Sequence, residues 1–268
     1  MQISGSSVAV VSFGLLVSIV AVVPFFFMGQ PHPGGMWHLQ MPWTYDMALH
    51  YDQMRDFSQG LAAGEIYPRW EEDTNRGFGA PTACFYPPGV YYLTALLYPF
   101  LRDWILVLLA ACLLITTASA IATYVLARRF VSTFAALVAA AVYLLLPYHL
   151  VDLYHRGALA ELLSFVWMPL ILFFADRLLT GPRSWPTLAG LSLSYGAFVW
   201  SHPPTAYQFS LVCLPLVFLM AFWRRDWKGL LWVAAGVVLG LALSAANLFP
   251  AAAEENLIRH EIVQQKFP

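Results

Sequence analysis

The residues best suited to chemistry begin with a carboxylate and an imidazole four positions apart. Asp46 and His50 stand at i and i+4, which places them on one face of a helix. Such a pair suits general-base work, with His50 orienting Asp46, or ligation of a divalent metal that takes a third ligand from elsewhere. The alternative is a solvated helix on which the two side chains meet without a function. Met47 and Met54 belong to an apolar side that could lie on the membrane interface.

A second group of candidates follows in a segment rich in glycine, proline and aromatic residues, which predicts a rigid loop. Arg69 beside Trp70, and Arg76 beside Asn75, could hold a phosphate group while aromatic faces, including that of Tyr86, stack on a sugar. These positions are therefore predicted to bind substrate. The alternative is an aromatic belt at the membrane interface, with arginine side chains that reach the surface.

Two later segments supply the remaining candidates. Arg156 and Glu161 flank the start of an apolar run, so Glu161 lies near the end of a membrane helix, where ionisable groups are rare and tend to be functional. We predict a catalytic role for Glu161 and substrate binding for Arg156, the alternative being a structural Arg–Glu clamp. His202, which precedes two prolines, is also predicted to bind substrate, unless it is a polar residue that ends a helix.

The elements that must position these residues are membrane helices. The chain has 268 residues, of which 60% are hydrophobic and only 11% charged, whereas a soluble domain is about a quarter charged. Disorder, nucleic-acid binding and a scaffold built on three cysteines are excluded on the same grounds. We expect an all-α polytopic bundle, a single domain over 1–268 with a large loop at 29–86. The predicted spans are 8–28, 104–127, 132–148, 161–180, 187–201, 205–222 and 230–250.

Basic residues predict the orientation, because short cytoplasmic loops are enriched in lysine and arginine. The basic stretches 128–129, 177–183 and 224–228 lie in alternate loops and are assigned to the cytoplasm with the N-terminus. Loop 29–86 is then extracytoplasmic, provided that Pro87–Leu101 forms a re-entrant or interfacial helix. The alternative is a full crossing by that segment, which would place loop 29–86 in the cytoplasm.

The formal net charge of −1 is then a cancellation between two faces. The predicted cytoplasmic segments hold seven of the 14 basic and two of the 15 acidic residues, so the outer face is acidic. All seven histidines fall in segments assigned to the outer face, which predicts one polar site there. They are His32, His38, His50, His149, His155, His202 and His260.

Signatures of several other functions are missing from the sequence. It contains no GxSxG elbow, no HExxH, no Walker loop and no paired CxxC. Carboxylates in the middle of a span, which a proton-coupled carrier would need, are absent as well, and this argues against transport.

Taken in order, the motifs resemble a known family. They are Asp46-x-x-x-His50, Gly64-x-x-Tyr67-Pro68-Arg69-Trp70, Asn75-x-Gly77-x-Gly79-x-Pro81, Phe85-Tyr86-Pro87-Pro88 and Arg156-Gly157-Ala158-x-x-Glu161. Over residues 40–260 this set resembles the bacterial multi-spanning "6-pyruvoyl-tetrahydropterin synthase-related" membrane proteins, which are similar in layout to GT-C glycosyltransferases. The pterin label implies no pterin chemistry, since a compact zinc-binding histidine set is absent.

The resemblance implies inverting transfer of a sugar from a polyprenyl-phosphate donor to an acceptor on the outer face. Asp46 matches the catalytic acidic residue of the first outer loop, and Glu161 matches a second-loop carboxylate less closely. Asp46 would deprotonate the acceptor hydroxyl or hold a divalent metal, the candidate cofactor, with support from His50. Arg69 and Arg156 would bind the donor phosphate.

The sequence is therefore interpreted as a membrane glycosyltransferase of the bacterial inner membrane. Its expected partners are membrane lipid and a lipid-linked sugar donor, and no nucleic acid. We expect the chain to correspond to the N-terminal half of such proteins, so that a partner subunit would supply the missing spans. The alternatives are a non-catalytic assembly subunit or truncated remnant, and a lipid or polysaccharide transporter.

Overall fold

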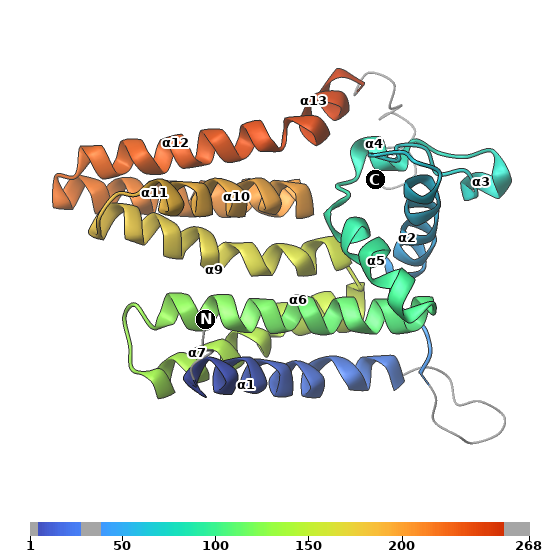
Figure 1. Ribbon diagram of the computed structural model, residues 1–268, viewed down its shortest axis with the longest axis horizontal. Helices are drawn as coiled ribbons and strands as arrows, with labels where there is room; N and C mark the ends of the chain where they lie inside the picture. Colours follow the sequence, from blue (N-terminus) through green and yellow to red (C-terminus); the bar gives the residue numbers. More distant parts are fainter. Residues whose placement is uncertain (1–4, 28–38, 255–268) are drawn as a thin grey trace, which may run out of the picture.

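The computed structural model describes residues 5–27 and 39–254, so His32, His38 and His260 lie outside it. The described residues form an elongated helical bundle with a cap of short helices at one end (Figure 1). Glu71 and Ala80 form an isolated antiparallel bridge within the cap. The elements are α1 (Gly5–Val22), η1 (Val23–Phe27), α2 (Met47–Ala62), α3 (Thr74–Gly77), α4 (Thr82–Phe85), α5 (Gly89–Leu101), α6 (Trp104–Ala127), α7 (Thr133–Leu144), α8 (Pro147–Val151), η2 (Asp152–Arg156), α9 (Leu159–Thr180), α10 (Trp185–Ser201), α11 (Pro203–Arg224), α12 (Trp227–Leu243) and α13 (Ala245–Ala253).

The prediction of an all-α polytopic bundle is confirmed, and five or six candidate spans correspond to the seven apolar runs of the sequence. Among the described residues, five helical segments are long and apolar enough to cross a membrane, and α12 with α13 makes a sixth if this pair, bent by 63°, counts as one. α10 has 17 residues, about 25 Å of helix, which is a little short of a ~30 Å hydrocarbon core. The five segments are Ser7–Phe27, Trp104–Ala127, Thr133–Arg156, Leu159–Thr180 and Pro203–Arg224.

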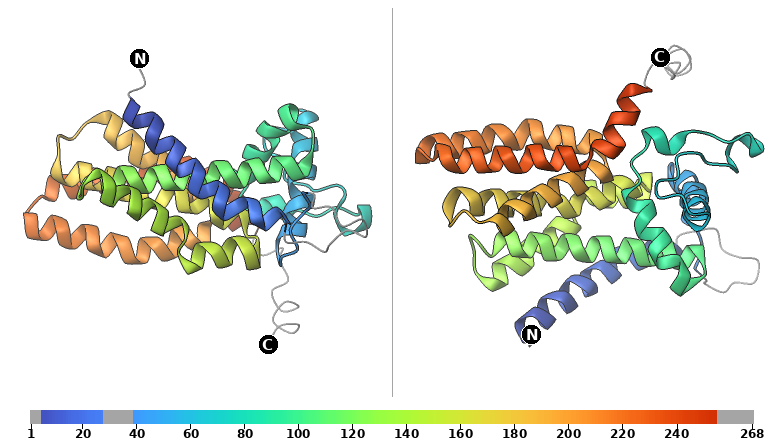
Figure 2. Two further views of the ribbon diagram at one scale, coloured as in Figure 1. Left: turned by 90° about the horizontal axis from the view of Figure 1, so that it is seen from below. Right: turned by 45° about the horizontal axis from the view of Figure 1, so that its top comes forward.

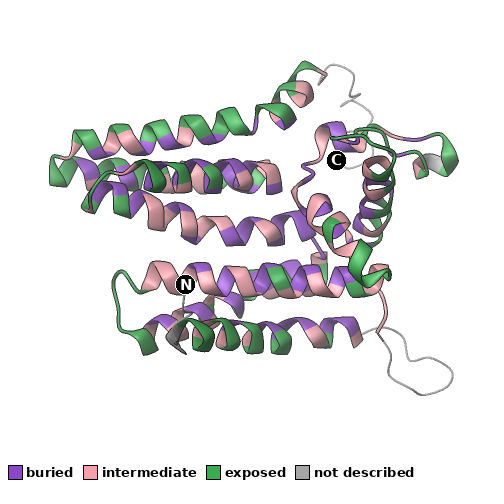
Figure 3. Cartoon of the chain, in the orientation of Figure 1, coloured by how far each residue is buried: buried purple, intermediate pink, exposed green. Residues whose placement is uncertain are grey.

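The long helices are apolar on their outer faces as well as inside. Figure 3 shows exposed residues along α1, α11 and α12, and these include large aliphatic side chains such as Leu16, Leu211 and Val238. A helix that is hydrophobic all round is typical of a membrane span, because lipid covers the face that other helices do not. α6 and α9 pack together at the centre and join the α1–α6–α7 layer to the α9–α12 layer (Figures 1 and 2).

α10 and α12 pack through small residues. A Cβ atom added to Gly240 would lie 2.9 Å from the carbonyl oxygen of Ser192, so the two backbones meet without a side chain between them. Gly236, Gly240 and Ser244 repeat every fourth residue on this face of α12. The Ser244 hydroxyl is 3.1 Å from the carbonyl oxygen of Gly196 on α10, to which it donates. Such small-xxx-small stripes let membrane helices approach closely, and dispersion forces then hold the pair.

The two ends of the bundle differ in chemistry. The basic stretches 128–129, 177–183 and 224–228 lie at the left end in Figure 1, which we call the basic end. The cap end, opposite, carries α2–α5, η2 and α13. α5 has 13 residues, about 20 Å, and stays at the cap end, as the re-entrant or interfacial interpretation requires. Which side of the membrane each end faces stays a prediction.

Enlarging Gly240 should separate α10 from α12. Gly240→Leu is expected to lower the free energy of unfolding by about 2 kcal/mol or more, because the added side chain overlaps the Ser192 backbone. Thermal unfolding of the protein in detergent measures the change. Ala235→Leu adds the same bulk to an exposed position of α12 and should leave stability near that of the wild type. Equal stability of the two variants would contradict this packing.

Candidate functional site

The candidate site is built around the short non-helical link, Gly157 and Ala158, between η2 and α9. η2 is a turn of π-helix in which the Gly157 N–H donates to the Asp152 carbonyl oxygen at 2.8 Å. Gly157 has a φ of +68°, which disfavours any residue with a side chain, and a Cβ atom there would collide with the Thr44 hydroxyl. Both the backbone conformation and the close contact therefore require glycine at this position. The Asp46 N–H donates to the Arg156 carbonyl oxygen at 2.9 Å, and this hydrogen bond holds the segment before α2 against the link between η2 and α9. π-helical turns occur frequently at functional sites.

Arg156 lies between two buried carboxylates. Its Nη1 atom donates to Asp152 Oδ1 at 3.0 Å and to Glu161 Oε2, and Asp152 and Glu161 are 0% and 4% exposed. Tyr148 donates its hydroxyl to Glu161 Oε1 at 2.6 Å. Burial of a carboxylate is costly without a cation and hydrogen-bond donors, and both are present here. Arg156 and Glu161 therefore form an ion pair, which we call the clamp, and their predicted roles in substrate binding and catalysis stay predictions.

The clamp extends to the start of α11. The Thr205 hydroxyl donates to Glu161 Oε1 at 3.3 Å, and His202 Nδ1 lies 2.6 Å from the Thr205 oxygen. Since Thr205 has one hydroxyl proton, His202 Nδ1 must be the donor, which leaves Nε2 as an acceptor. Burial lowers the pKa of His202 below its usual value, while the Glu161 carboxylate opposes that shift. A neutral His202 thus belongs to the same network as Glu161.

His50 is fully buried and positioned by a residue of α5. Its Nδ1 atom lies 2.9 Å from the Tyr91 hydroxyl, which in turn donates to Gln53 Oε1. His50 Nδ1 is therefore the donor to Tyr91, and Nε2 is a buried acceptor without a hydrogen-bond partner among the described residues. Burial lowers the pKa of His50 to about 4, and the nearby His202 adds to the shift. Neutral His50 can accept a hydrogen bond but carries no charge near pH 7.

The burial of α2 differs from the sequence-based expectation. Met47 and Met54 are fully buried in the core, so they do not form a surface on the membrane interface. His50 is buried too, so α2 is not the solvated helix considered as the alternative. Asp52, Arg55 and neighbouring exposed residues form the narrow outer stripe of this helix. α2 is held between α5 and the loop segments of the cap, which periodicity alone could not reveal.

Asp46 and Tyr86 complete the polar cluster. Asp46 is partly exposed at the N-cap position of α2, where its side chain makes no capping hydrogen bond. The Tyr86 ring lies 5.8 Å from that of His50. Burial, and then the negative charge of Asp46, raise the pKa of Tyr86, whereas Arg156 lowers it. The structure therefore brings together six predicted residues, which we call the polar cluster: Asp46, His50, Tyr86, Arg156, Glu161 and His202.

The other predicted substrate-binding residues lie elsewhere in the cap. The Arg69 guanidinium is 5.2 Å from the centre of the Tyr67 ring, and Trp70 packs on Gly79. Arg76 and Asn75 are in α3, which projects away from the bundle in Figure 1, and the Asn75 side chain is not described. None of the contacts described for Arg69, Trp70 and Arg76 joins them to the polar cluster. Their roles stay predictions.

The described residues do not favour a metal site at Asp46 and His50. Within residues 5–27 and 39–254, no three His, Cys, Asp or Glu side chains are placed to hold a metal ion together. His50 offers only Nε2, because Nδ1 is bonded to Tyr91. A divalent ion normally takes more ligands than Asp46 and one imidazole nitrogen supply. We therefore derive no step through a metal.

Sequence reasoning missed several residues of this network. Asp152 is four positions before Arg156, an ion-pair spacing on a helix that could have identified it. Tyr148 and Thr205 contact Glu161, and Tyr91 contacts His50 from 41 positions away. These partners come from other elements, so no local pattern points to them.

An apolar groove lies between the helices that lead to the cap end. It has a volume of about 360 Å³ and runs between α5, α9, α10 and α12. Leu163, Trp167, Trp200 and Ser201 are among the residues that line it, and Ser201 directly precedes His202 in the chain, whereas the residues of the polar cluster are not part of its lining. Trp167 is fixed by the hydrogen bond that its indole N–H donates to Ser201 at 2.8 Å. A groove of this lining suits an alkyl chain.

The all-α bundle and its long apolar helices define a polytopic membrane protein. The family model of the 6-pyruvoyl-tetrahydropterin synthase related domain, a domain of membrane proteins, matches residues 83–267, and the chain belongs to this family. The predicted resemblance is confirmed to that extent. Tyr86, Arg156, Glu161 and His202 lie within the match, whereas Asp46 and His50 precede it. No curated protein matches the chain closely enough to indicate a relative.

Removal of Arg156 should destabilise the cap end through the carboxylates that it leaves unpaired. Arg156→Met is expected to lower the free energy of unfolding by about 2 kcal/mol, less than for a fully buried pair because the arginine side chain is 36% exposed. Adding Asp152→Asn should recover part of this loss by removing one of the two buried carboxyl groups that Arg156 contacts. Thermal unfolding in detergent compares both variants with Lys228→Met, which removes an exposed cation. A double variant no more stable than Arg156→Met would argue against the clamp.

Acid should destabilise the protein partly through His50. Its pKa is about 4 when folded and about 6.5 when unfolded, so the unfolded chain binds more protons between these values and stability rises with pH there. Between pH 7 and pH 5 the loss from this group is on the order of 2 kcal/mol. His50→Gln should flatten the pH dependence of the unfolding temperature, whereas His155→Gln, at an exposed histidine, should not. Identical pH profiles of the three proteins would refute the assignment.

Proposed function

We propose that this protein is a membrane glycosyltransferase that transfers a sugar from a polyprenyl-phosphate-linked donor to a hydroxyl acceptor at the cap end. The observation that carries the proposal is a partly exposed carboxylate, Asp46, in a polar cluster, together with an apolar groove that is lined by Ser201, the residue before His202. A lipid-linked phosphate has the same two-part chemistry, a polar head and an alkyl chain. We further propose that the cap end is extracytoplasmic and that the membrane is the bacterial inner membrane.

Asp46 is the best candidate for the general base. Glu161 accepts hydrogen bonds from Tyr148, Arg156 and Thr205, so its basicity is reduced and its oxygens are occupied. Asp46 makes no capping bond and is open to solvent in part. It would take the proton of the acceptor hydroxyl as that oxygen attacks the anomeric carbon from the face opposite the phosphate. The bond from the anomeric carbon to the phosphate oxygen breaks, and the lipid phosphate leaves with the electron pair.

Two residues would orient the substrates, with support from His50. His202 presents a neutral Nε2 acceptor, which suits a sugar hydroxyl donor, whereas the Nε2 atom of His50 is buried, so that His50 would support the polar cluster from within. The bonds of Arg156 to described residues all use Nη1, so its Nη2 and Nε groups are the ones that would contact the donor phosphate. The donor alkyl chain would follow the groove along Leu163 and Trp167. A role for Arg69 in binding the donor phosphate, and roles for Trp70, Asn75 and Arg76 in binding substrate, are part of the same proposal.

Replacement of Asp46 tests the proposal most directly. Asp46→Asn keeps the shape of the side chain but removes the base, so sugar transfer should fall by about 100-fold or more. The measurement is transfer from a radiolabelled polyprenyl-phosphate sugar by the full chain in reconstituted membranes. Asp52→Asn, at an exposed carboxylate on the same helix, should retain wild-type activity.

Two results would contradict the proposed function. Full transfer by Asp46→Asn would exclude Asp46 as the base. Failure of the wild-type protein to use any lipid-linked sugar, alone or with the proteins that copurify with it, would favour a non-catalytic assembly subunit.

A further inference from the structure

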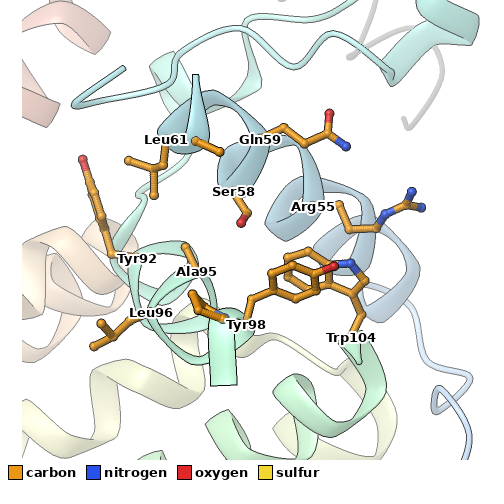
Figure 4. Close-up of a pocket in the computed structure, with 11 residues that line it drawn as sticks. Arg55, Ser58, Gln59, Leu61, Tyr92, Ala95, Leu96, Tyr98 and Trp104 are labelled. Atoms are coloured by element: carbon orange, nitrogen blue, oxygen red, sulfur yellow. The ribbon is translucent and has the colours of Figure 1, made fainter. Parts of the chain in front are cut away.

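A second cavity is lined by residues that lie outside the polar cluster. It has a volume of about 660 Å³ and lies between α2 and α5, against the first residue of α6 (Figure 4). Arg55, Ser58 and Gln59 line it from α2, whereas His50 and Gln53 are on another face of that helix. On a helix with 100° per residue, these two sets point in different directions. The proposed transfer reaction does not use this cavity.

The two walls of the cavity differ in polarity. The α2 wall carries a cation and two polar side chains, those of Arg55, Ser58 and Gln59, beside the apolar Leu61 and Ala62. In Figure 4 the Ser58 side chain points toward α5, whereas the ends of the Arg55 and Gln59 side chains extend outward at the edge of the cavity. The α5 wall is apolar, with Ala95 and Leu96 among its residues. An occupant must therefore present an anionic or polar group to α2 and hydrocarbon to α5.

Arg55 is a cation without a carboxylate partner within ion-pair distance. None of the ion pairs between described residues includes it, and its guanidinium lies 5.7 Å from the centre of the Tyr51 ring. Its exposed position at the rim of the cavity leaves its N–H groups available to an anion. A guanidinium binds a phosphate diester through charge-assisted hydrogen bonds.

The position along the bundle indicates where the anion comes from. Trp104 lines the cavity and is the first residue of the span Trp104–Ala127, so the cavity lies at the level where this helix enters the apolar phase. Tyr98 stacks on Trp104 with ring centres 4.0 Å apart, and such aromatic pairs are typical of the membrane interface. Leu96, which lines the cavity, and Phe100 beyond it are 66% and 81% exposed, so the apolar surface continues outward from the cavity. Phospholipid headgroups are found at this depth.

We propose that this cavity binds one anionic phospholipid of the surrounding leaflet, with its phosphate at Arg55 and its acyl chains along α5. The volume falls within the range of small-molecule sites, so it takes the headgroup and glycerol while the chains continue over Leu96 and Phe100. The bound lipid joins α2 to α5. These two helices also carry His50 and Tyr91, so the lipid stabilises the support of the polar cluster from the opposite side of α2.

Lipid binding by the full chain tests this proposal. Protein purified in non-ionic detergent is titrated with phosphatidylglycerol, phosphatidylcholine or inorganic phosphate, and native mass spectrometry counts the molecules retained while thermal unfolding is followed in parallel. We expect one tightly retained phosphatidylglycerol, with about tenfold preference over phosphatidylcholine. Arg55→Gln should abolish that preference, and Ala95→Trp should prevent retention by filling the cavity. Lys228→Gln, which removes an exposed cation at the basic end, should bind like the wild type.

Three outcomes would overturn the proposal. The first is equal retention of the two lipids by the wild type, and the second is unchanged retention in both Arg55→Gln and Ala95→Trp. The third is stabilisation by inorganic phosphate that matches stabilisation by phosphatidylglycerol, since an anion site would then need no lipid. Arg55 is exposed, so Arg55→Gln tests the site even if Ala95→Trp fails to fold.

Discussion

The contact of Arg156 with two buried carboxylates is the interaction on which the cap end depends. Asp152 and Glu161 come from different helical segments, and the guanidinium of Arg156 pairs with both of these buried carboxyl groups. The contact fixes the π-helical turn of η2 against the start of α9, and Gly157 between them admits the segment that leads into α2. Through the hydrogen bond from the Asp46 N–H to the Arg156 carbonyl oxygen, the same contact sets the position of Asp46, which forms no ion pair with the residues that the structure describes.

Below the cap, the bundle relies on a different kind of contact. α12 meets α10 through Gly236, Gly240 and Ser244, where close backbone approach replaces the hydrophobic effect that lipid removes. The charged groups are confined to the two ends, and at the basic end Arg129 pairs with Asp176 at 2.7 Å across two helices. The long helices therefore act as a rigid support, and the polar chemistry of the protein is gathered where they meet the cap.

Much of this site was predictable because each candidate carries its own local signal. Asp46 and His50 are spaced for one helix face, and Arg156 and Glu161 stand at the start of a membrane helix, where an ionisable residue is costly. Their partners carried no such signal, since Tyr91 reaches His50 from 41 positions away and Thr205 reaches Glu161 from another helix. Hydrogen bonds of this sequence separation are set by packing, which periodicity does not encode.

Hydropathy by itself determined that this is an all-α polytopic membrane protein, because runs of apolar residues near the thickness of a bilayer have few other structures open to them. The alternation of basic stretches likewise predicted which loops lie together at one end. Only the tertiary structure decided that α2 is buried, with Met47 and Met54 in the core, and that Arg156 is a clamp between two carboxylates. The physical reason is that burial and charge pairing depend on neighbours from distant parts of the chain, whereas membrane insertion depends on the composition of each segment alone.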